Sequence, residues 1–301
     1  MMLDKLCRRV LAGCAVLAVV PAAGCSAKST PPGPPAIGAL PVVAGPADIV
    51  LPLDDYLETD TQYATSVHAL LSLTAQCMSR YGFTASTDFG RLPTWRDHGN
   101  LFGLVDDADT RRAGYKWFQP REITVGDTAK DAAPPRSPEE RAVAVGSVPA
   151  YAGKTVPKGG CDQEAAEKLA TGEPGAGVND AFVQNLENDA YQQTEADPRV
   201  LAAFKDWSAC MAASGYQYSV PKDANNAAFA MPEADQMTMA AVDLKCRQKA
   251  NLVPLQLAVD RAYQQRLIEK NAQALNDMRK AISVQADNAA RELATSHGTT
   301  T

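Results

Sequence analysis

The sequence predicts a mainly α-helical domain held together by two disulfides. Apolar residues make up 46% of the chain but aromatic residues only 6%. Alanine supplies much of the apolar content, and this composition favours closely packed helices over sheets. Over residues 55–80, and again after residue 160, apolar side chains recur at helical spacing. A cysteine-containing pattern also occurs twice, which predicts the covalent framework.

The repeated pattern is Cys-Met-x3-Gly-aromatic-x2-Ser, which starts at Cys77 and again at Cys210. Each copy is followed by Cys-x-Gln-x-Ala, starting at Cys161 and Cys246. An even number of cysteines in an exported chain indicates disulfides. The order of the repeats selects the pairings Cys77–Cys161 and Cys210–Cys246.

The repeat also predicts the domain plan. We expect a disulfide-linked helical domain over residues 55–253, built from two similar units at 55–170 and 178–253. Zinc is the alternative use of the cysteines, but structural zinc sites take close pairs such as Cys-x2-Cys, and the chain has none. A Cys-x-x-Cys redox pair is missing too. The sequence therefore predicts no metal site and no cofactor.

The N-terminus resembles a bacterial lipoprotein signal peptide over residues 1–24. Cationic residues near the start precede an apolar run at residues 10–20, which has the length of a secretory signal. Small residues then lead to Cys25, which in such signals carries the diacylglycerol and palmitate-type acyl chains. We expect Cys25 to anchor the protein to the extracytoplasmic face of the cell membrane, because two or more acyl chains bind stably. The alternative is an ordinary cleavage site near Cys25.

The next segment, residues 25–54, is rich in proline and predicts an extended tether between anchor and domain. The formal charge of −6 argues against nucleic acid as a partner, because phosphate binding needs a basic face. An acidic surface also disfavours general adhesion to anionic lipid. Membrane attachment is therefore expected through lipid alone.

Within the domain, the first helix is expected over residues 55–80, with Gly82 at the position that ends it. Further helices are expected at 161–170, 180–194, from Asp197-Pro198 onward, and from Pro232-Glu233 onward. Residues 83–160 lack helical periodicity and predict a long irregular insertion. Loops of this length are often functional, so we expect specificity to reside there.

The C-terminal part, residues 254–301, predicts one long helix and a short tail. Residues 255–293 contain no helix breaker, and Ile268, Leu275, Ile282 and Ala289 recur every seven positions. The apolar seam is thin beyond Leu275. We expect the first half to pack on the domain and the second half to be solvated and projecting. The alternative is a coiled-coil contact with a partner.

Catalytic motifs are scarce. The sequence has no Gly-x-Ser-x-Gly elbow, no His-Glu-x-x-His and no phosphate-binding Gly-x4-Gly-Lys-Ser/Thr. His98 is the histidine best placed for acid–base work, and Trp95, Trp117 and Phe118 are candidate ligand contacts beside it. A carboxylate pair could act without a motif, and the clusters that offer one are Asp106, Asp107, Asp109, Glu139 and Glu140.

Several features together resemble a group of uncharacterised cell-envelope lipoproteins from actinobacteria. They are the lipoprotein-like signal, the Pro-rich tether, the long final helix and a set of internal motifs. These motifs are Trp207-x2-Cys210-Met211 with Gly215-Tyr216, Ala241-x-Asp243-x2-Cys246, and the Leu101-Phe-Gly-Leu-Val stretch leading to Gly114-Tyr115. The resemblance covers most of the mature chain and implies an architecture but no activity.

The sequence favours a binding protein at the cell envelope over an enzyme. Its expected partner is an envelope protein or the cell wall, contacted through the insertion or the final helix. The alternative is an envelope enzyme, such as a carboxylate-based wall hydrolase. A solute-binding lipoprotein is disfavoured because alternating strand and helix patterns are missing.

Overall fold

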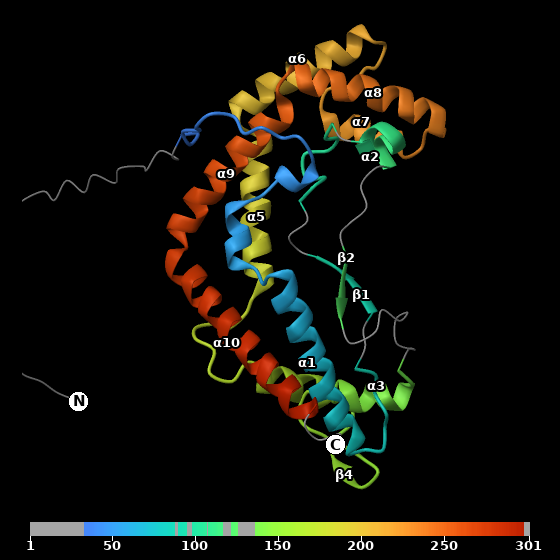
Figure 1. Ribbon diagram of the computed structural model, residues 1–301, viewed down its shortest axis with the longest axis vertical. Coiled ribbons are helices and arrows are strands. Elements are labelled where there is room, and N and C mark those ends of the chain that lie inside the picture. Colours follow the sequence, from blue (N-terminus) through green and yellow to red (C-terminus); the bar gives the residue numbers. More distant parts are fainter. Residues whose placement is uncertain are drawn as a thin grey trace, which may run out of the picture. The chain divides into compact units, whose positions relative to one another are not determined.

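The computed structural model describes residues 33–87, 90–94, 98–106, 108–116, 122–125 and 136–297. Within these residues the chain is mainly helical, as the sequence predicted (Figure 1). It also forms two short two-stranded sheets, which the sequence did not predict. The α-helices are α1 Asp60–Ser79, α2 Ala108–Ala113, α3 Pro138–Ala144, α4 Gly160–Leu169, α5 Asp180–Glu195, α6 Pro198–Ala213, α7 Pro221–Ala228, α8 Glu233–Lys249, α9 Leu252–Lys270 and α10 Ala272–His297. The 3₁₀ helices are η1 Pro46–Asp48, η2 Pro52–Tyr56 and η3 Gly114–Lys116.

Helix α1 shows how local sequence sets the helix ends. Thr59 accepts a hydrogen bond from the Gln62 amide, and the Gln62 side chain bonds back to the Thr59 amide, which forms a capping box. At the other end Gly82 adopts a φ of 84°. The Gly82 amide donates to Ser79 O at 3.1 Å and the Phe83 amide to Met78 O at 3.3 Å. This Schellman turn confirms the predicted role of Gly82.

The second copy of the repeated pattern forms the same turn at the end of α6. Gly215 has a φ of 91°, its amide donates to Ala212 O at 3.0 Å, and the Tyr216 amide donates to Met211 O at 3.0 Å. In each copy the aromatic side chain packs in the same cluster as the methionine five residues earlier. The sequence repeat is therefore a repeat of local structure.

Both predicted disulfides are present. Cys77 is bonded to Cys161 and Cys210 to Cys246, each with Cα atoms 5.5 Å apart. The partner cysteines differ in their setting: Cys161 lies in the first turn of α4, whereas Cys246 lies in the last turn of α8. The likeness thus holds for the Schellman turns but not for the placement of the partner cysteines. That the domain consists of two similar units stays a prediction.

The largest hydrophobic cluster lies where α6, α8 and the first half of α9 pack together. Trp207, Met211, Met239 and Leu252 are fully buried there. Helix α5 runs beside α9, and α1 lies between α4 and α10 (Figure 1). Two polypeptide segments outside these helices join the core, the one before α1 and the insertion after it.

The described part of the insertion contains more regular secondary structure than expected. Strand β1 Gly90–Pro93 pairs antiparallel with β2 Glu122–Val125, and β3 Ala150–Tyr151 pairs with β4 Lys154–Thr155. Strands of two to four residues are too short to produce a readable alternation of apolar and polar residues. Helix α7 was also missed. Pro221 at its first position marks its start.

The long C-terminal helix is confirmed, with one interruption at Asn271, which separates α9 from α10. The expectation that its second half projects into solvent is wrong. Ile282 packs with η2, and Ala289 is fully buried in a cluster with residues of α1 and α4. The few apolar residues of α10 are enough to hold it on the domain, because small residues let α10 approach α1 closely.

The tether also differs at its C-terminal end. It was expected to reach residue 54, but Ile49, Leu51 and Leu53 are at most 3% exposed and join the core. Asp54 is buried as well. No helix among the described residues is long and apolar enough to cross a membrane.

Candidate functional site

Two of the buried polar clusters in the described part of the domain include residues of the insertion. The first centres on Asp243, whose Oδ1 accepts hydrogen bonds from Trp207 Nε1 at 2.6 Å and Arg247 Nε at 2.8 Å. Its Oδ2 accepts a bond from the Tyr115 hydroxyl at 2.8 Å, and Arg247 Nη1 donates to Phe102 O at 2.6 Å. Both carboxylate oxygens are therefore hydrogen-bonded, and such a cluster is structural in character.

Two glycines of the insertion allow it to approach this cluster. A Cβ added to Gly103 would lie 2.9 Å from Arg247 Nη2, and one added to Gly114 would lie 2.6 Å from Gln236 Oε1. Both glycines have positive φ. Three of the internal motifs, those around Trp207, Asp243 and Gly103 to Tyr115, therefore meet in one place, where they fix the insertion to the core.

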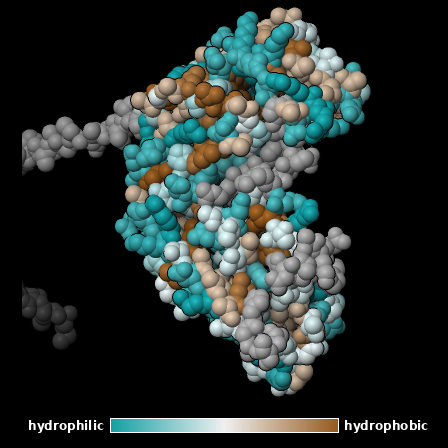
Figure 2. Space-filling view, viewed as in Figure 1, coloured by the Kyte–Doolittle hydropathy of each residue, from teal (hydrophilic) through white to brown (hydrophobic). Residues whose placement is uncertain are grey.

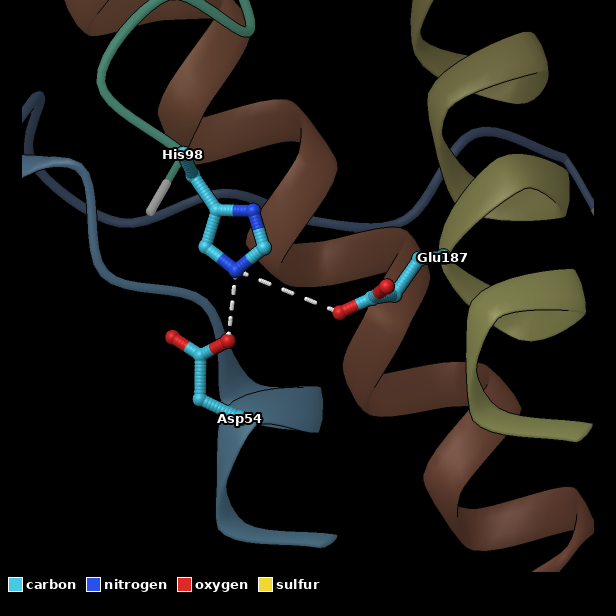
Figure 3. A group of neighbouring side chains, drawn as sticks. All are labelled: Asp54, His98 and Glu187. Atoms are coloured by element: carbon cyan, nitrogen blue, oxygen red, sulfur yellow. Dashed lines mark hydrogen bonds and ion pairs between the residues drawn. The ribbon is translucent and has the colours of Figure 1, made fainter. Parts of the chain in front are cut away.

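The second cluster brings His98 against two carboxylates (Figure 3). His98 Nε2 lies 2.6 Å from Asp54 Oδ1 and 4.0 Å from Glu187 Oε1. Asp54 comes from η2, Glu187 from α5, and His98 from the insertion. The three side chains are 5%, 18% and 11% exposed, respectively. One side-chain oxygen of each carboxylate and the His98 nitrogen all lie within 4.8 Å of one another.

Local structure positions each of the three groups. Asp54 Oδ2 accepts a hydrogen bond from the Leu51 amide at 2.9 Å, at the start of η2, which leaves Oδ1 facing His98. The carbonyl of His98 accepts a bond from the Leu101 amide at 2.9 Å. Glu187 Oε1 is buried but has no hydrogen-bond partner among the residues that the structure describes. A buried carboxylate oxygen without a partner is costly, so this one calls for a physical explanation.

A row of polar side chains on α9 lies near Asp54, His98 and Glu187. Gln256, Asp260 and Gln264 are spaced by four residues and are at most 3% exposed. Asp260 accepts hydrogen bonds from Thr194 Oγ1 at 3.2 Å and Gln264 Nε2 at 2.8 Å. Gln264 Oε1 in turn accepts one from the Leu53 amide at 3.0 Å. The α9 row thereby fixes η2, and with it Asp54.

The carboxylates of this region are crowded and poorly solvated. Burial raises the pKa of Glu187 to about 7, and the charges of Asp54 and Asp260 add to the effect. Burial likewise raises the pKa of Asp260 to about 7. For His98, burial lowers the pKa, but the Asp54 hydrogen bond and the nearby carboxylates outweigh it, so the net pKa is raised. The site therefore holds more acidic groups than its one imidazole can pair, and a bound cation would favour their ionised forms.

The other candidates from the sequence are not brought together. Trp95, Trp117, Phe118, Asp107 and Cys25 lie outside the described residues. The remaining candidate carboxylates do not form a facing pair. Asp106 pairs with Arg111 at 2.8 Å, and Asp109 pairs with Arg112. Glu140 completes the N-terminal cap of α3, and Glu139 is exposed in the first turn of that helix.

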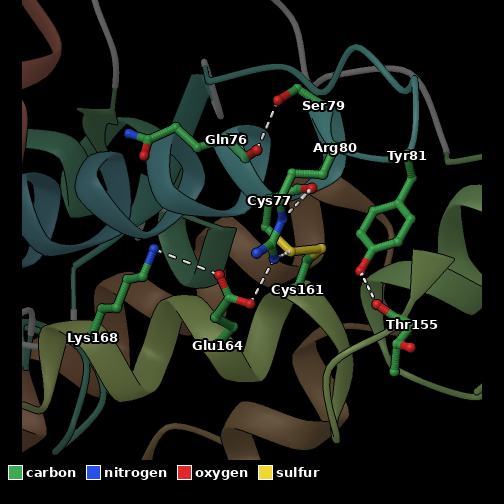
Figure 4. A network of polar contacts seen from close by, with 9 residues as sticks. All are labelled: Gln76, Cys77, Ser79, Arg80, Tyr81, Thr155, Cys161, Glu164 and Lys168. Carbon is green, nitrogen blue, oxygen red and sulfur yellow. Dashed lines mark hydrogen bonds and ion pairs between the residues drawn. A yellow bond between two sulfur atoms is a disulfide. The ribbon is translucent and has the colours of Figure 1, made fainter.

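The corner around Cys77–Cys161 is held by polar contacts (Figure 4). Arg80 Nη2 donates to Glu164 Oε2 at 2.6 Å, and Lys168 lies 3.6 Å from the other oxygen of Glu164. The Tyr81 hydroxyl donates to Thr155 O at 2.7 Å and so ties β4 to the end of α1. These contacts brace the base of the insertion.

Sequence reasoning identified His98 but missed its partners. Asp54 was assigned to the tether, and Glu187 borders the apolar stripe of α5 without being part of it. One signal was readable: Gln256, Asp260 and Gln264 recur every four residues among apolar neighbours on a long helix. A polar row at that spacing indicates a buried polar interface.

Comparisons with protein-family models, with curated proteins and with solved structures find no match for this chain.

Proposed function

We propose that this chain is a lipid-anchored extracytoplasmic protein that binds a partner at the cell envelope. Residues 1–24 act as the signal peptide, Cys25 carries the lipid, and a Pro-rich tether leads to the domain. The observation that carries this proposal is that all four cysteines of the domain are used in two disulfides. Such bonds persist in oxidising compartments outside the cytoplasm.

The insertion is the better candidate for partner contact. Helix α10 buries Leu275, Ile282 and Ala289 within the domain, so it does not offer the exposed apolar seam that a coiled coil needs. On the face in Figure 2, hydrophobic side chains form separate small patches among hydrophilic ones. The insertion is covalently tied at its base and reaches solvent at residues such as Val145, which is 50% exposed.

Site-specific photocrosslinking in living cells tests this assignment. A photoreactive amino acid replaces Val145 on the insertion or, as the matched control, Leu201 on α6, which is 44% exposed. We expect a discrete crosslinked partner from the Val145 position and none from Leu201. Equal crosslinking at both positions, or none at Val145, would contradict partner binding through the insertion.

Membrane attachment is tested by replacing Cys25 with Ala. We expect the wild-type chain in the membrane fraction and the C25A chain either unprocessed or released from the membrane after processing. An unchanged membrane fraction with a processed C25A chain would count against lipid anchoring.

A carboxylate-based wall hydrolase is the second candidate, favoured by one observation. Carboxylate oxygens of Asp54 and Glu187 lie within 4.8 Å of one another, and burial raises the pKa of Glu187 to about 7. Retaining glycosidases use a carboxylate pair about 5 Å apart in which one member stays protonated. Against this, His98 bridges the pair and the three side chains are largely buried. Release of sugar from purified cell wall that E187Q abolishes would support the enzyme.

A further inference from the structure

We infer that Asp54 Oδ1, His98 Nε2 and Glu187 Oε1 form a binding site for a divalent transition-metal ion, with Zn²⁺ as the preferred ion. The donor set is one imidazole and two carboxylates from three separate elements. Imidazole selects transition metals over Mg²⁺ and Ca²⁺, which prefer oxygen alone. This inference goes beyond partner binding and does not depend on it.

The spacing of the three atoms suits a tetrahedral ion. Zinc binds nitrogen and oxygen at about 2.0–2.1 Å, so two ligands of a tetrahedral site lie about 3.3 Å apart. The His98 nitrogen lies 2.6 Å from the Asp54 oxygen and 4.0 Å from the Glu187 oxygen. Changes of under 1 Å, one longer and one shorter, would bring these two distances to that spacing, and the Asp54 and Glu187 oxygens already lie within 4.8 Å of one another.

The unpartnered Glu187 oxygen is explained by such an ion. A histidine N–H points at one acceptor, and His98 Nε2 is already paired with Asp54 at the shorter distance. Glu187 Oε1 is beyond hydrogen-bond range of that nitrogen and buried without another donor. A metal ion between the three groups would satisfy both carboxylates at once.

The surroundings support the site without adding ligands. Asp54 Oδ2 is held by the Leu51 amide, which is the kind of outer hydrogen bond that orients a ligating carboxylate. Both oxygens of Asp260 are engaged by Thr194 and Gln264, so Asp260 adds no ligand. Three protein ligands leave a fourth position for water or a small ligand, as in zinc sites that remain open.

The sequence predicted no metal because it contains neither paired cysteines nor His-Glu-x-x-His. The present ligands come from residues 54, 98 and 187, and no short motif spans such distances. Only the fold brings them together.

Isothermal titration of the full chain with ZnCl₂, after treatment with chelator and with both disulfides intact, tests the site. We expect one equivalent of Zn²⁺ to bind, and H98A, D54N and E187Q each to weaken binding by about tenfold or more. Matched controls are H68A on α1, D55N beside Asp54, and D189N on α5, which should bind as wild type. MgCl₂ and CaCl₂ should not compete, and MnCl₂ should bind more weakly.

A second measurement needs no variant and guards against misfolding of the substituted chains. X-ray absorption at the zinc edge of the loaded wild-type chain should show one imidazole with oxygen donors and no sulfur. No zinc binding by the wild-type chain, sulfur in the first shell, or unchanged binding by H98A would overturn the inference.

Discussion

The indole N–H of Trp207 donates a 2.6 Å hydrogen bond to Asp243, so the motif around Cys210 and the motif around Cys246 are joined by a polar contact as well as by a disulfide. Asp243 also receives bonds from Tyr115 and Arg247. One buried carboxylate thus connects α6, α8 and the insertion.

Replacing Asp243 by Ala should lower the free energy of unfolding by about 3–5 kcal/mol, because Arg247 would be left buried and unpaired. D243N should cost less, about 1–3 kcal/mol, since the amide still accepts one hydrogen bond. Urea unfolding followed by circular dichroism measures both. D109N, at an exposed ion pair, should change stability by less than about 0.5 kcal/mol. If D243A were as mild as D109N, the cluster would not be structural.

Removing the disulfides one at a time should reveal two contributions of similar size. The closed loops span 84 and 36 residues, so chain entropy predicts about 4.5 kcal/mol for Cys77–Cys161 and about 4 kcal/mol for Cys210–Cys246. The double variants C77A/C161A and C210A/C246A test this by chemical unfolding. Reduced wild-type protein should be less stable than either variant. Stability unaffected by reduction would contradict a structural role.

Gly103 should tolerate alanine much less well than Gly153. Both have positive φ, 83° and 76°, but only the Gly103 Cβ would meet Arg247, while the one at Gly153 meets nothing within 4 Å. We expect G153A to cost about 1 kcal/mol from backbone strain, and G103A to cost about 1–3 kcal/mol more. Equal losses in thermal unfolding would show that the insertion does not pack on Arg247 as described.

Stability should decrease as the pH rises from about 5 to about 8. The pKa of Asp260 is raised by burial to about 7 in the folded chain, above its usual value of 3.8. A raised acid pKa means that the folded state holds the proton more tightly than the unfolded state does. The stability that this proton binding contributes is fully present below the unfolded pKa and is lost as the pH rises through about 7. The pKa values of Glu187 and His98 are raised too, and they act in the same direction.

The variant D260N isolates this effect. An amide cannot ionise, so the pH dependence should become flatter, and at about pH 8 the variant should be more stable than wild type by about 1 kcal/mol. Unfolding curves in chelator at several pH values provide the measurement. A wild-type stability that rises with pH over this range would contradict the assignment.

The covalent framework and the helical class could be predicted because their signals are local. Cys77 lies in the last turn of α1, and Gly82 and Phe83 form the turn that follows it. The same spacing recurs from Cys210 onward. The pairing followed from that repeat. The bounds of α5 and the starts of α6 and α8 were readable because caps such as Asp197-Pro198 act within a few residues.

The candidate site could not be predicted in the same way. His98 was identifiable as a residue type, but Asp54 and Glu187 reach it from elsewhere in the sequence, and burial decides their chemistry. The prediction that the second half of the final helix projects into solvent was wrong for a related reason. Ala289 has little apolar surface, so its complete burial depends on how closely α1 and α4 approach it.

Export, lipid attachment and oxidation together form the central claim, and intact mass spectrometry of the chain extracted from membranes tests it most directly. After alkylation without reduction, the account predicts a chain that begins at Cys25, carries acyl lipid on that residue, and has no alkyl group at Cys77, Cys161, Cys210 or Cys246. A chain that retains residues 1–24, or one alkylated at all four positions, would contradict it.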